Sequence, residues 1–476
     1  MATVRLPVVQ SATGSIQSDG RRRRIVPADV RGRFDRARKV VFVVLIALWS
    51  ALPWIRIAGK PAVFLDVDAR KFFLFGATFN AQDAWLLFFL FSGVGFGLVY
   101  LTAVAGRAWC GWACPQTVFL EGVYRRIERW IEGPREKHLR RDAGDVTLSR
   151  VARKVAKHAA FALASLAIAH IILAYFVSLP RAFAMVRGSP AAHPEAFAWV
   201  FAITSLLYGN FAWFREQLCV VMCPYGRLQS VLLDEDSLVV GYDVKRGEPR
   251  GKATARMADA PSDGSRYERK AEGDCVDCNR CVVVCPTGID IRNGLQLDCL
   301  ACTACIDACD DVMTKVGRPR GLIRYDSPNG LAGKARKLVR PRLVLYTGML
   351  VVGATVAFFA TRSRTDFEVN ASRLRGAPYT IESGSLRNAF DLHLVNKRGG
   401  REAFLLSVDV PDGIDAVLPV TRVEIDSLAD THVPLFLTMA QARFHGDVAA
   451  RIRVTREASD GRDAVFAPIT FLGASP

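Results

Sequence analysis

Five segments of the chain are long and apolar enough to cross a lipid bilayer. A spanning helix needs roughly 20 mostly apolar residues, because each residue advances the helix by only about 1.5 Å. Pro53 interrupts the first segment, which is therefore the least regular. The pattern predicts about five transmembrane helices, at residues 39–57, 84–105, 158–179, 196–214 and 342–360.

Beyond residue 361 the pattern changes from long apolar runs to alternating apolar and polar positions. Such alternation is typical of strands with one buried face, and turn sequences such as KRGG and PDG lie between the runs. About seven short strands in roughly 110 residues predict an immunoglobulin-like β-sandwich at 361–476. Because it contains no cysteine and no evident catalytic cluster, we expect a docking or structural role.

Polar stretches divide the rest of the chain. Residues 115–132 predict an amphipathic helix with Arg125, Arg126 and Arg129 on its polar side, lying on anionic lipid. Residues 245–274 are rich in Gly, Pro, Ser, Asp and Arg and indicate a linker, and 315–340 form a basic connector. The expected domains are a disordered basic tail at 1–38, a four-helix bundle at 39–230 with a loop at 106–157, a cysteine-rich domain at 231–341, a fifth helix at 342–360 and the sandwich at 361–476.

The charge distribution predicts an orientation in the membrane. Hydrophobic residues make up 51% of the chain, and the formal net charge is +17. Lys and Arg number 12 in 106–157 and 20 in 215–340, against 3 in 58–83 and 2 in 180–195. Basic residues concentrate on the cytoplasmic side of membrane proteins, so this pattern explains the charge without a nucleic-acid partner. We expect the N-terminus, 106–157 and 215–341 in the cytoplasm, and the short loops and the sandwich outside.

Eight of the twelve cysteines lie between Cys275 and Cys309, in CVDCNRCVVVCP and CLACTACIDACD. Each is a C-x2-C-x2-C-x3-C run of the bacterial ferredoxin type, in which the fourth cysteine binds the other cluster. In the second run Asp310 replaces the usual proline. The spacing predicts an α+β ferredoxin-like domain with two [4Fe–4S] clusters, one on Cys275, Cys278, Cys281 and Cys309, the other on Cys299, Cys302, Cys305 and Cys285.

The other four cysteines form two C-x3-C-P motifs, each at the cytoplasmic end of a predicted span. They are Cys110 and Cys114 before Pro115, and Cys219 and Cys223 before Pro224. A proline suits the first turn of a new helix, so each second cysteine is expected at a helix N-terminus, which would favour thiolate. Four soft sulfur donors suit Cu(I), Zn or Fe–S, and paired thiols can also exchange electrons as a disulfide. Spacing leaves these alternatives open.

Other candidate cofactor sites are weaker. The chain has no C-x-x-C-H for c-type haem, and His170 is the only histidine deep in a predicted span, where a b-type haem usually has two. Met222 could add a thioether to the four thiols, but packing is the more common role of such a residue. Without a visible nucleotide-binding unit, electrons must come from another protein or from quinol.

Together these features resemble the FixG/RdxA/CcoG family, accessory proteins for assembly of cbb-type cytochrome oxidase. CGWACPQTVF and CVVMCPYGRLQS at the ends of spans, the double-cluster run, one further span and a β-sandwich carry the resemblance, from about residue 35 to the end. It implies a multi-pass protein of the bacterial inner membrane, with the clusters cytoplasmic and the sandwich periplasmic. It also implies an oxidoreductase that reduces Cu(II) to Cu(I), with copper-handling and oxidase assembly proteins as partners.

The expected path runs from an unidentified cytoplasmic donor through two clusters to Cys110, Cys114, Cys219 and Cys223, the proposed catalytic and copper-binding residues. Two alternatives stay open. The protein could relay electrons to another respiratory or nitrogen-fixation complex, or be a scaffold for oxidase assembly that catalyses nothing. The oligomeric state is also open, with a homodimer as one option.

Overall fold

The computed structural model describes residues 24–57, 60–67, 71–80, 83, 85–251, 273–363, 365–398, 400–427, 429–459 and 463–474. The chain forms two compact units. One contains residues 1–77 and 87–355, and the other contains residues 78–86 and 356–476. Residues 1–23 of the expected tail and 252–272 of the expected linker lie outside the described residues.

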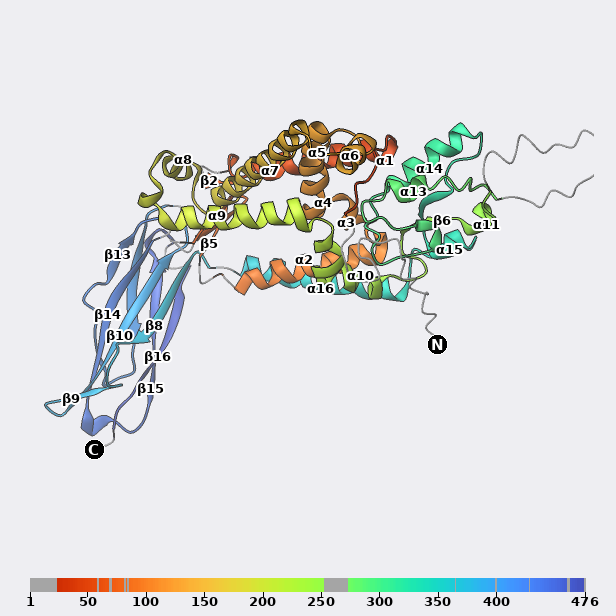
Figure 1. Ribbon diagram of the computed structural model, residues 1–476. Coiled ribbons are helices and arrows are strands. Elements are labelled where there is room, and N and C mark those ends of the chain that lie inside the picture. The colour runs from red at the N-terminus through yellow and green to blue at the C-terminus, as the bar shows by residue number, and fades with distance from the viewer. Residues whose placement is uncertain are drawn as a thin grey trace, which may run out of the picture. The chain divides into compact units, whose positions relative to one another are not determined.

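Four helices of the described residues are long and apolar enough to cross a membrane. They are α2 (Leu86–Ala105), α7 (Leu148–Ala174), α9 with its π-helical extension η4 (Pro194–Gly209 and Asn210–Phe214), and α16 (Pro341–Arg362) (Figure 1). Their large apolar side chains are mostly exposed, as the lipid-facing surface of a spanning helix would be. Four of the five predicted spans therefore have a matching helix.

The first predicted span, 39–57, differs in its bounds from the helix that forms there, and this helix is not among the four candidate spans of the described residues. Helix α1 runs from Arg33 to Ala51, so its apolar part is only about twelve residues long before the chain turns at Pro53. Its first turns are charged.

The carboxylate of Asp307, on α14 (Ala304–Lys315), accepts hydrogen bonds from the backbone N–H groups of Phe34 and Asp35 at 3.2 and 2.7 Å. Residues 24–38 are thus structured rather than part of a disordered tail.

The predicted interfacial helix is one continuous segment made of α4 (Pro115–Phe119), η2 (Leu120–Tyr124) and α5 (Arg125–Glu132). Its polar side faces protein rather than lipid. Arg125 is buried and pairs with Glu121 and Glu216, and Arg129 donates to the backbone carbonyl of Pro27. Of the three arginines only Arg126 is exposed. The expectation that this face lies on lipid is therefore wrong for Arg125 and Arg129.

Short elements connect the helices of this unit. The described residues between α1 and α2 in the sequence include five short strands, of which β3 and β4 form an antiparallel hairpin and β5 belongs mostly to the second unit. Small helices flank the long ones elsewhere. The strands are β1 (Arg56–Ile57), β2 (Lys60–Pro61), β3 (Val63–Asp66), β4 (Lys71–Leu74) and β5 (Ala77–Asn80), and the helices are α3 (Ala108–Trp112), α6 (Arg135–Ala143), α8 (Leu179–Arg187), η3 (Pro190–Ala192), η5 (Leu218–Met222) and α10 (Pro224–Leu232).

The cysteine-rich domain is closed by strands from both of its ends. Strand β6 (Val239–Tyr242), which precedes the cysteines, pairs antiparallel with β7 (Ile323–Asp326), which follows them. The two strands pack with α14 around a core that contains Ile306, Met313 and Ile323. Thus part of the predicted 315–340 connector belongs to the folded domain. The other elements are α11 (Val244–Gly247), α13 (Arg280–Val283), η6 (Ile291–Asn293) and α15 (Pro328–Leu331).

The second unit is a β-sandwich, as the alternating pattern predicts. One sheet has the order β12-β14-β10-β8, with β9 paired to β10, and the other has the order β13-β11-β15-β16. Apolar side chains from both sheets form one core, including Leu392, Leu435 and Ile452. The strands are β8 (Phe367–Arg373), β9 (Thr380–Glu382), β10 (Ser385–Asn396), β11 (Glu402–Asp409), β12 (Asp415–Val417), β13 (Arg422–Ile425), β14 (Asp430–Ala440), β15 (Val448–Arg456) and β16 (Val465–Phe471), with short helices η7 (Gln441–Arg443) and η8 (Glu457–Ser459).

Candidate metal centres

The two cysteine runs share one backbone conformation. In each run the residues on either side of the second cysteine have positive φ, at 51° and 54° for Asp277 and Asn279 and at 50° and 63° for Ala301 and Thr303. Left-handed backbone is unfavourable for residues other than glycine, by roughly 1–2 kcal/mol each. Its repetition at matching positions shows that both loops curl in the same way, which turns the thiols of each loop inward.

The eight thiols line two cavities. Cys275, Cys278, Cys281 and Cys309 line one, and Cys285, Cys299, Cys302 and Cys305 line the other, to which Cys281 also contributes. These are the two ligand sets that the spacing predicts, each with its fourth cysteine from the opposite run. Ligation itself stays a prediction, since the grouping shows only that four thiols can reach one cluster.

The donor sets fit [4Fe–4S] clusters. Burial raises the pKa of Cys281, Cys309 and Cys285 to about 12 and that of Cys299 to about 11. Four sulfurs so close together cannot all be thiolates without a compensating cation, and the iron of a cluster supplies that charge. In the second run Asp310 stands where the first has Pro286, so α14 continues through Cys309 to Lys315, and Asp310 accepts a hydrogen bond from Gly321 at 2.8 Å.

The four C-x3-C-P cysteines also lie close together. Cys114 and Cys223 are the N-cap residues of α4 and α10, with extended backbone, and Pro115 and Pro224 open those helices, as predicted. The thiol of Cys219 is near enough to those of the other three for their charges to interact. The two repeats therefore bring their sulfurs to one place, which we call the four-cysteine site.

The helix N-termini were expected to favour thiolate at Cys114 and Cys223, but burial acts against this at Cys114 in the protein without metal. Burial raises the pKa of Cys110 to about 11 and that of Cys219 to about 12, and it also raises the pKa of Cys114. Backbone N–H groups at the start of α4 lower the pKa of Cys114, but burial outweighs them. A bound cation would be needed to stabilise several thiolates here.

Gln229 is a polar neighbour of this site that the sequence analysis missed. Its side chain is fully buried, and its amide nitrogen lies 3.3 Å from the sulfur of Cys110. The signal was present in the repeat, because both proline-initiated helices carry a glutamine, Gln116 in the first and Gln229 in the second. Gln116 instead donates to the carbonyl of Arg215 at 2.9 Å, which links the first motif to the segment just before the second.

The loop of the Cys299 run lies directly on the first C-x3-C-P motif. Gly111, between Cys110 and Trp112, has no room for a side chain, because a Cβ there would lie 2.5 Å from the carbonyl oxygen of Ala301. Trp112 donates to the hydroxyl of Tyr325 at 3.0 Å, and Tyr325 donates to that same carbonyl at 3.0 Å. A cluster ligand loop and the four-cysteine site are therefore in backbone contact.

Arg107 strengthens this contact. Its guanidinium donates to the backbone carbonyl of Cys299 at 3.0 Å and to that of Gly226 on α10 at 2.7 Å, and it also reaches the carbonyl of Leu297. One buried side chain thus joins the cluster loop to both repeats. The positive charge of Arg107 also lowers the pKa of Cys110 and of Cys219, although burial of these thiols outweighs it.

Charged side chains also hold the two repeats together. Arg215, four residues before Cys219, has a positive φ of 56° and donates to Glu128 of α5 at 2.7 Å. Burial alone would raise the pKa of Glu128, but Arg215, Lys157 and Arg24 outweigh it and hold that pKa at about 2. This pair connects the helix after the first motif to the start of the second.

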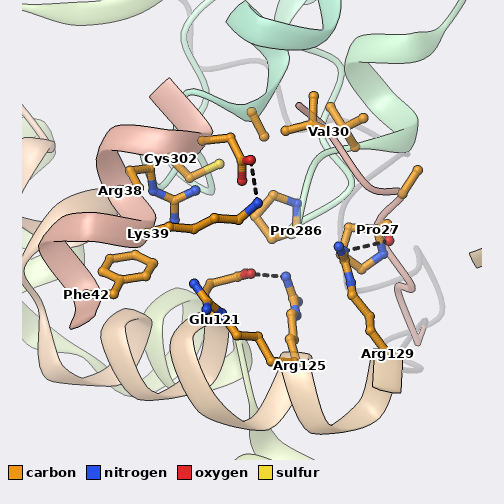
Figure 2. Close-up of a pocket in the computed structure, with 15 residues that line it drawn as sticks. Pro27, Val30, Arg38, Lys39, Phe42, Glu121, Arg125, Arg129, Pro286 and Cys302 are labelled. Carbon is orange, nitrogen blue, oxygen red and sulfur yellow. Dashed lines mark hydrogen bonds and ion pairs between the residues drawn. The ribbon is translucent and has the colours of Figure 1, made fainter. Parts of the chain in front are cut away.

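A cavity lies beside Cys302, between α1, α5 and the N-terminal segment, by which we mean the described residues that precede α1 (Figure 2). Ala28 of that segment donates to the carbonyl of Val283, so the segment covers one side of the cavity. Arg38 and Phe42 of α1 line it from another side (Figure 2). Arg38 also donates to the carbonyl of Gly111 at 3.0 Å, so α1 contacts the first motif.

The structure gives no support for His170, His158 or Met222 as cofactor ligands. His170 lies 2.8 Å from the carbonyl of Leu166 on its own helix, and His158 lies 2.9 Å from the hydroxyl of Tyr208, so each has a hydrogen-bond partner. Met222 is exposed, with 62% of its surface accessible. The hydrogen bonds fit the structural role that was favoured for histidine, whereas the exposure of Met222 does not fit the packing role that was favoured for it.

Comparison with known proteins supports the same assignment. The chain is 35% identical to the nitrogen fixation protein FixG of Rhizobium meliloti (strain 1021) over 473 residues, which cover 89% of this chain and 88% of the relative. It is 35% and 33% identical to the proteins RdxA and RdxB of Cereibacter sphaeroides, over 86% and 82% of each chain. The chain belongs to the FixG/RdxA family. The predicted resemblance is therefore confirmed.

Family models of 4Fe–4S domains match both regions of the chain that contain cysteines. Residues 214–328 match a 4Fe–4S dicluster domain, a range that includes the second C-x3-C-P motif, and residues 85–135, which include the first, match a 4Fe–4S binding domain. Residues 357–474 match the IG-like fold at the C-terminus of FixG, which that description gives as a candidate oxidoreductase. The chain is thus an iron–sulfur electron-transfer protein with an Ig-like domain.

Proposed function

We propose that this protein reduces Cu(II) to Cu(I) at the four-cysteine site, for assembly of a cbb-type cytochrome oxidase. The observation that supports it most is the backbone contact between the Cys299 loop and the first C-x3-C-P motif, at Gly111 and Ala301. An electron carried in that loop would have a short path through protein to four soft sulfur donors.

The clusters, when bound, supply one-electron carriers. One electron from a reduced carrier converts one Cu(II) to one Cu(I), and no bond to carbon, oxygen or hydrogen is made or broken. Thiolate ligands stabilise Cu(I) more than Cu(II), so binding at Cys110, Cys114, Cys219 and Cys223 favours the reduction. In the metal-free protein the protons on these buried thiols must leave as copper binds.

The proposal includes an orientation. Because Lys and Arg concentrate in 106–157 and 215–340, these segments and the clusters are cytoplasmic. Among the described residues, α16 is the only candidate span between the cysteine-rich domain and the β-sandwich, so a cytoplasmic cysteine-rich domain implies a periplasmic sandwich. The donor is then a cytoplasmic protein or quinol, and the partners are copper-handling and oxidase assembly proteins.

A serine substitution of all four C-x3-C-P cysteines tests the site. Membranes that contain the variant should reduce Cu(II) no faster than membranes without the protein, as measured with a Cu(I)-specific chelator. Iron and sulfide per chain and the cluster EPR signals must stay at the wild-type level. Met222→Leu is the matched control, because Met222 is a sulfur-containing neighbour on the exposed side, and its rate should be unchanged. Wild-type reduction in the four-serine variant would exclude the site.

A second candidate function is electron relay to another respiratory or nitrogen-fixation complex. It is favoured by the similarity to a protein named for nitrogen fixation. An experiment with purified protein distinguishes the copper reductase from the electron relay. The clusters are reduced, the reductant is removed, and the protein is mixed with Cu(II) and the chelator. If Cu(I) chelate forms no faster than with heat-treated protein, the relay is the better explanation.

A further inference from the structure

Two histidines face each other on the outer surface of the β-sandwich. His393 of β10 is the direct cross-strand partner of His432 of β14, and their rings stack with centroids 4.5 Å apart and planes 16° from parallel. The neighbouring residues Leu392 and Leu394 point into the core, so both imidazoles lie on the solvent side of the sheet.

A carboxylate accompanies each imidazole. His393 Nε2 lies 2.8 Å from Asp430 Oδ2, and His432 Nδ1 lies 2.7 Å from Asp391 Oδ2. In the part of the chain that the structure describes, neither aspartate has an ion pair with Lys or Arg. The side chains of His432 and Asp430 are both 58% exposed, so an ion from solvent can reach them.

This group has the donor types and spacing of a transition-metal site. One ligand atom each from His393, Asp430 and His432 lie within 4.8 Å of one another. Bonds of about 2.0–2.2 Å around a tetrahedral ion separate its ligand atoms by roughly 3.4 Å, so the exposed side chains need to move by only about 1 Å. Asp391 would then orient the ring of His432 from behind, in a carboxylate–histidine–metal arrangement.

The other histidine–carboxylate group of the described residues differs in its electrostatics. Glu128, Glu132 and His138 are also close together, but they are buried in the first unit. Lys157 and Arg215 already neutralise their charges, at 3.2 Å from Glu132 and 2.7 Å from Glu128. The positive charges of Lys157 and Arg215 would repel a divalent cation. We therefore interpret Glu128, Glu132 and His138 as part of an ion-pair network. Among the residues that the structure describes, no lysine or arginine forms an ion pair with the aspartates of the sandwich cluster.

We propose that His393, Asp430 and His432, with Asp391 behind them, form a surface site for a divalent transition metal. Imidazole and carboxylate suit Cu(II), Zn(II) and Ni(II), and the Irving–Williams order makes Cu(II) the tightest of these. The site prefers the oxidised form of copper, whereas four thiolates prefer the reduced form. The inference does not depend on the proposed function, because the cluster uses none of the twelve cysteines.

The test uses the full chain in detergent, with the four C-x3-C-P cysteines changed to serine so that thiols do not compete, and with the clusters oxidised. One equivalent of Cu(II) is added, and three-pulse ESEEM reports the remote nitrogen of each coordinated imidazole. The parent should show the modulation of two imidazoles. The double variant His393→Ala/His432→Ala should lose this modulation and bind Cu(II) about tenfold or more weaker. The variant Asp391→Asn should bind Cu(II) about tenfold weaker than the parent.

His445→Ala is the matched control, since His445 is an exposed histidine of the same domain, and it should leave the signal and the affinity unchanged. A second measurement uses the otherwise wild-type chain. After dialysis against Zn(II), the double histidine variant should hold one zinc less per chain than the wild type. The proposal is overturned if the parent shows no imidazole modulation, or if His445→Ala loses the modulation as fully as the double histidine variant does. It is also overturned if the zinc content of the double variant equals that of the wild type.

Discussion

Glu128→Gln should weaken the connection between the two cysteine repeats by an amount that the structure allows us to work out. The pKa of Glu128 is about 2 in the folded protein, against an ordinary value of 4.5. The difference of about 2.5 units, at 1.36 kcal/mol per unit, corresponds to roughly 3 kcal/mol. Because the side chains of Glu128 and Arg215 are only 10% and 5% exposed, solvent screens this interaction little.

The same pKa difference predicts how the effect depends on pH. The folded state holds the carboxylate ionised, so its stabilisation is complete above the unfolded pKa and is lost as pH falls from about 5 towards 2. Glutamine cannot ionise. The stability difference between wild type and Glu128→Gln should therefore be constant from pH 8 to about 5.5 and should narrow below that.

The assay is thermal unfolding of the helical unit in detergent, followed by far-ultraviolet circular dichroism between pH 8 and pH 4. A loss of roughly 3 kcal/mol should lower the midpoint by about 6–12 °C near neutral pH. Asp311→Asn is the control, because its ion pair with Lys315 is exposed and should shift the midpoint by about 2 °C at most. A midpoint change in Glu128→Gln as small as the control's, or a difference that does not narrow at low pH, would refute the reasoning.

Three further changes test other contacts. Gly111→Ala should slow Cu(II) reduction severalfold while both clusters persist in EPR, because its Cβ meets a backbone carbonyl of the cluster loop, whereas Gly93→Ala, with open space around it, should change nothing. Asp307→Ala removes the cap of α1 and should cost about 1–2 kcal/mol, measured as faster tryptic cleavage in the first turns of that helix. Lys397→Met removes the ammonium that pairs with buried Asp83 and should destabilise the β-sandwich by about 3–5 kcal/mol in thermal unfolding.

The sequence was most informative where covalent spacing limits geometry. Three cysteines two residues apart can reach only one corner of a cluster, so the fourth ligand had to come from the other run, and Cys309 and Cys285 lie where this requires. Asp310 was the one departure from the motif. The structure explains it, because a proline at that position would interrupt α14, which instead continues to Lys315.

The errors have a common physical cause, which is burial by distant parts of the chain. The pattern around Arg125 predicts a polar surface, but Glu216, ninety-one residues away, pairs with it inside the protein. The charged start of α1 looked like a tail before a span, yet Asp307 caps it. The helix N-terminus at Cys114 was expected to favour thiolate, but burial raises the pKa of this thiol. None of these partners can be identified from local sequence.

Residues whose role depends on a close approach were missed for the same reason. Gly111 appears in the sequence only as the residue after Cys110, and a glycine between two bulky neighbours has many explanations. Its role is visible only once the carbonyls of Leu300 and Ala301 lie against it. Gln229 could have been suspected from the repeat, because Gln116 follows the first proline in a similar helix.

The two C-x3-C-P repeats are alike in local structure but not in their surroundings, and this difference bears on the proposed electron path. Each has an N-cap cysteine and a proline that opens a helix. The first repeat packs its backbone on a cluster loop, through Gly111, and the arginine before it, Arg107, binds the carbonyl of Cys299. The corresponding arginine of the second repeat, Arg215, binds Glu128 instead. On the proposed path an electron therefore enters the four-cysteine site through the repeat that contains Cys110, and the second repeat completes the set of sulfur ligands.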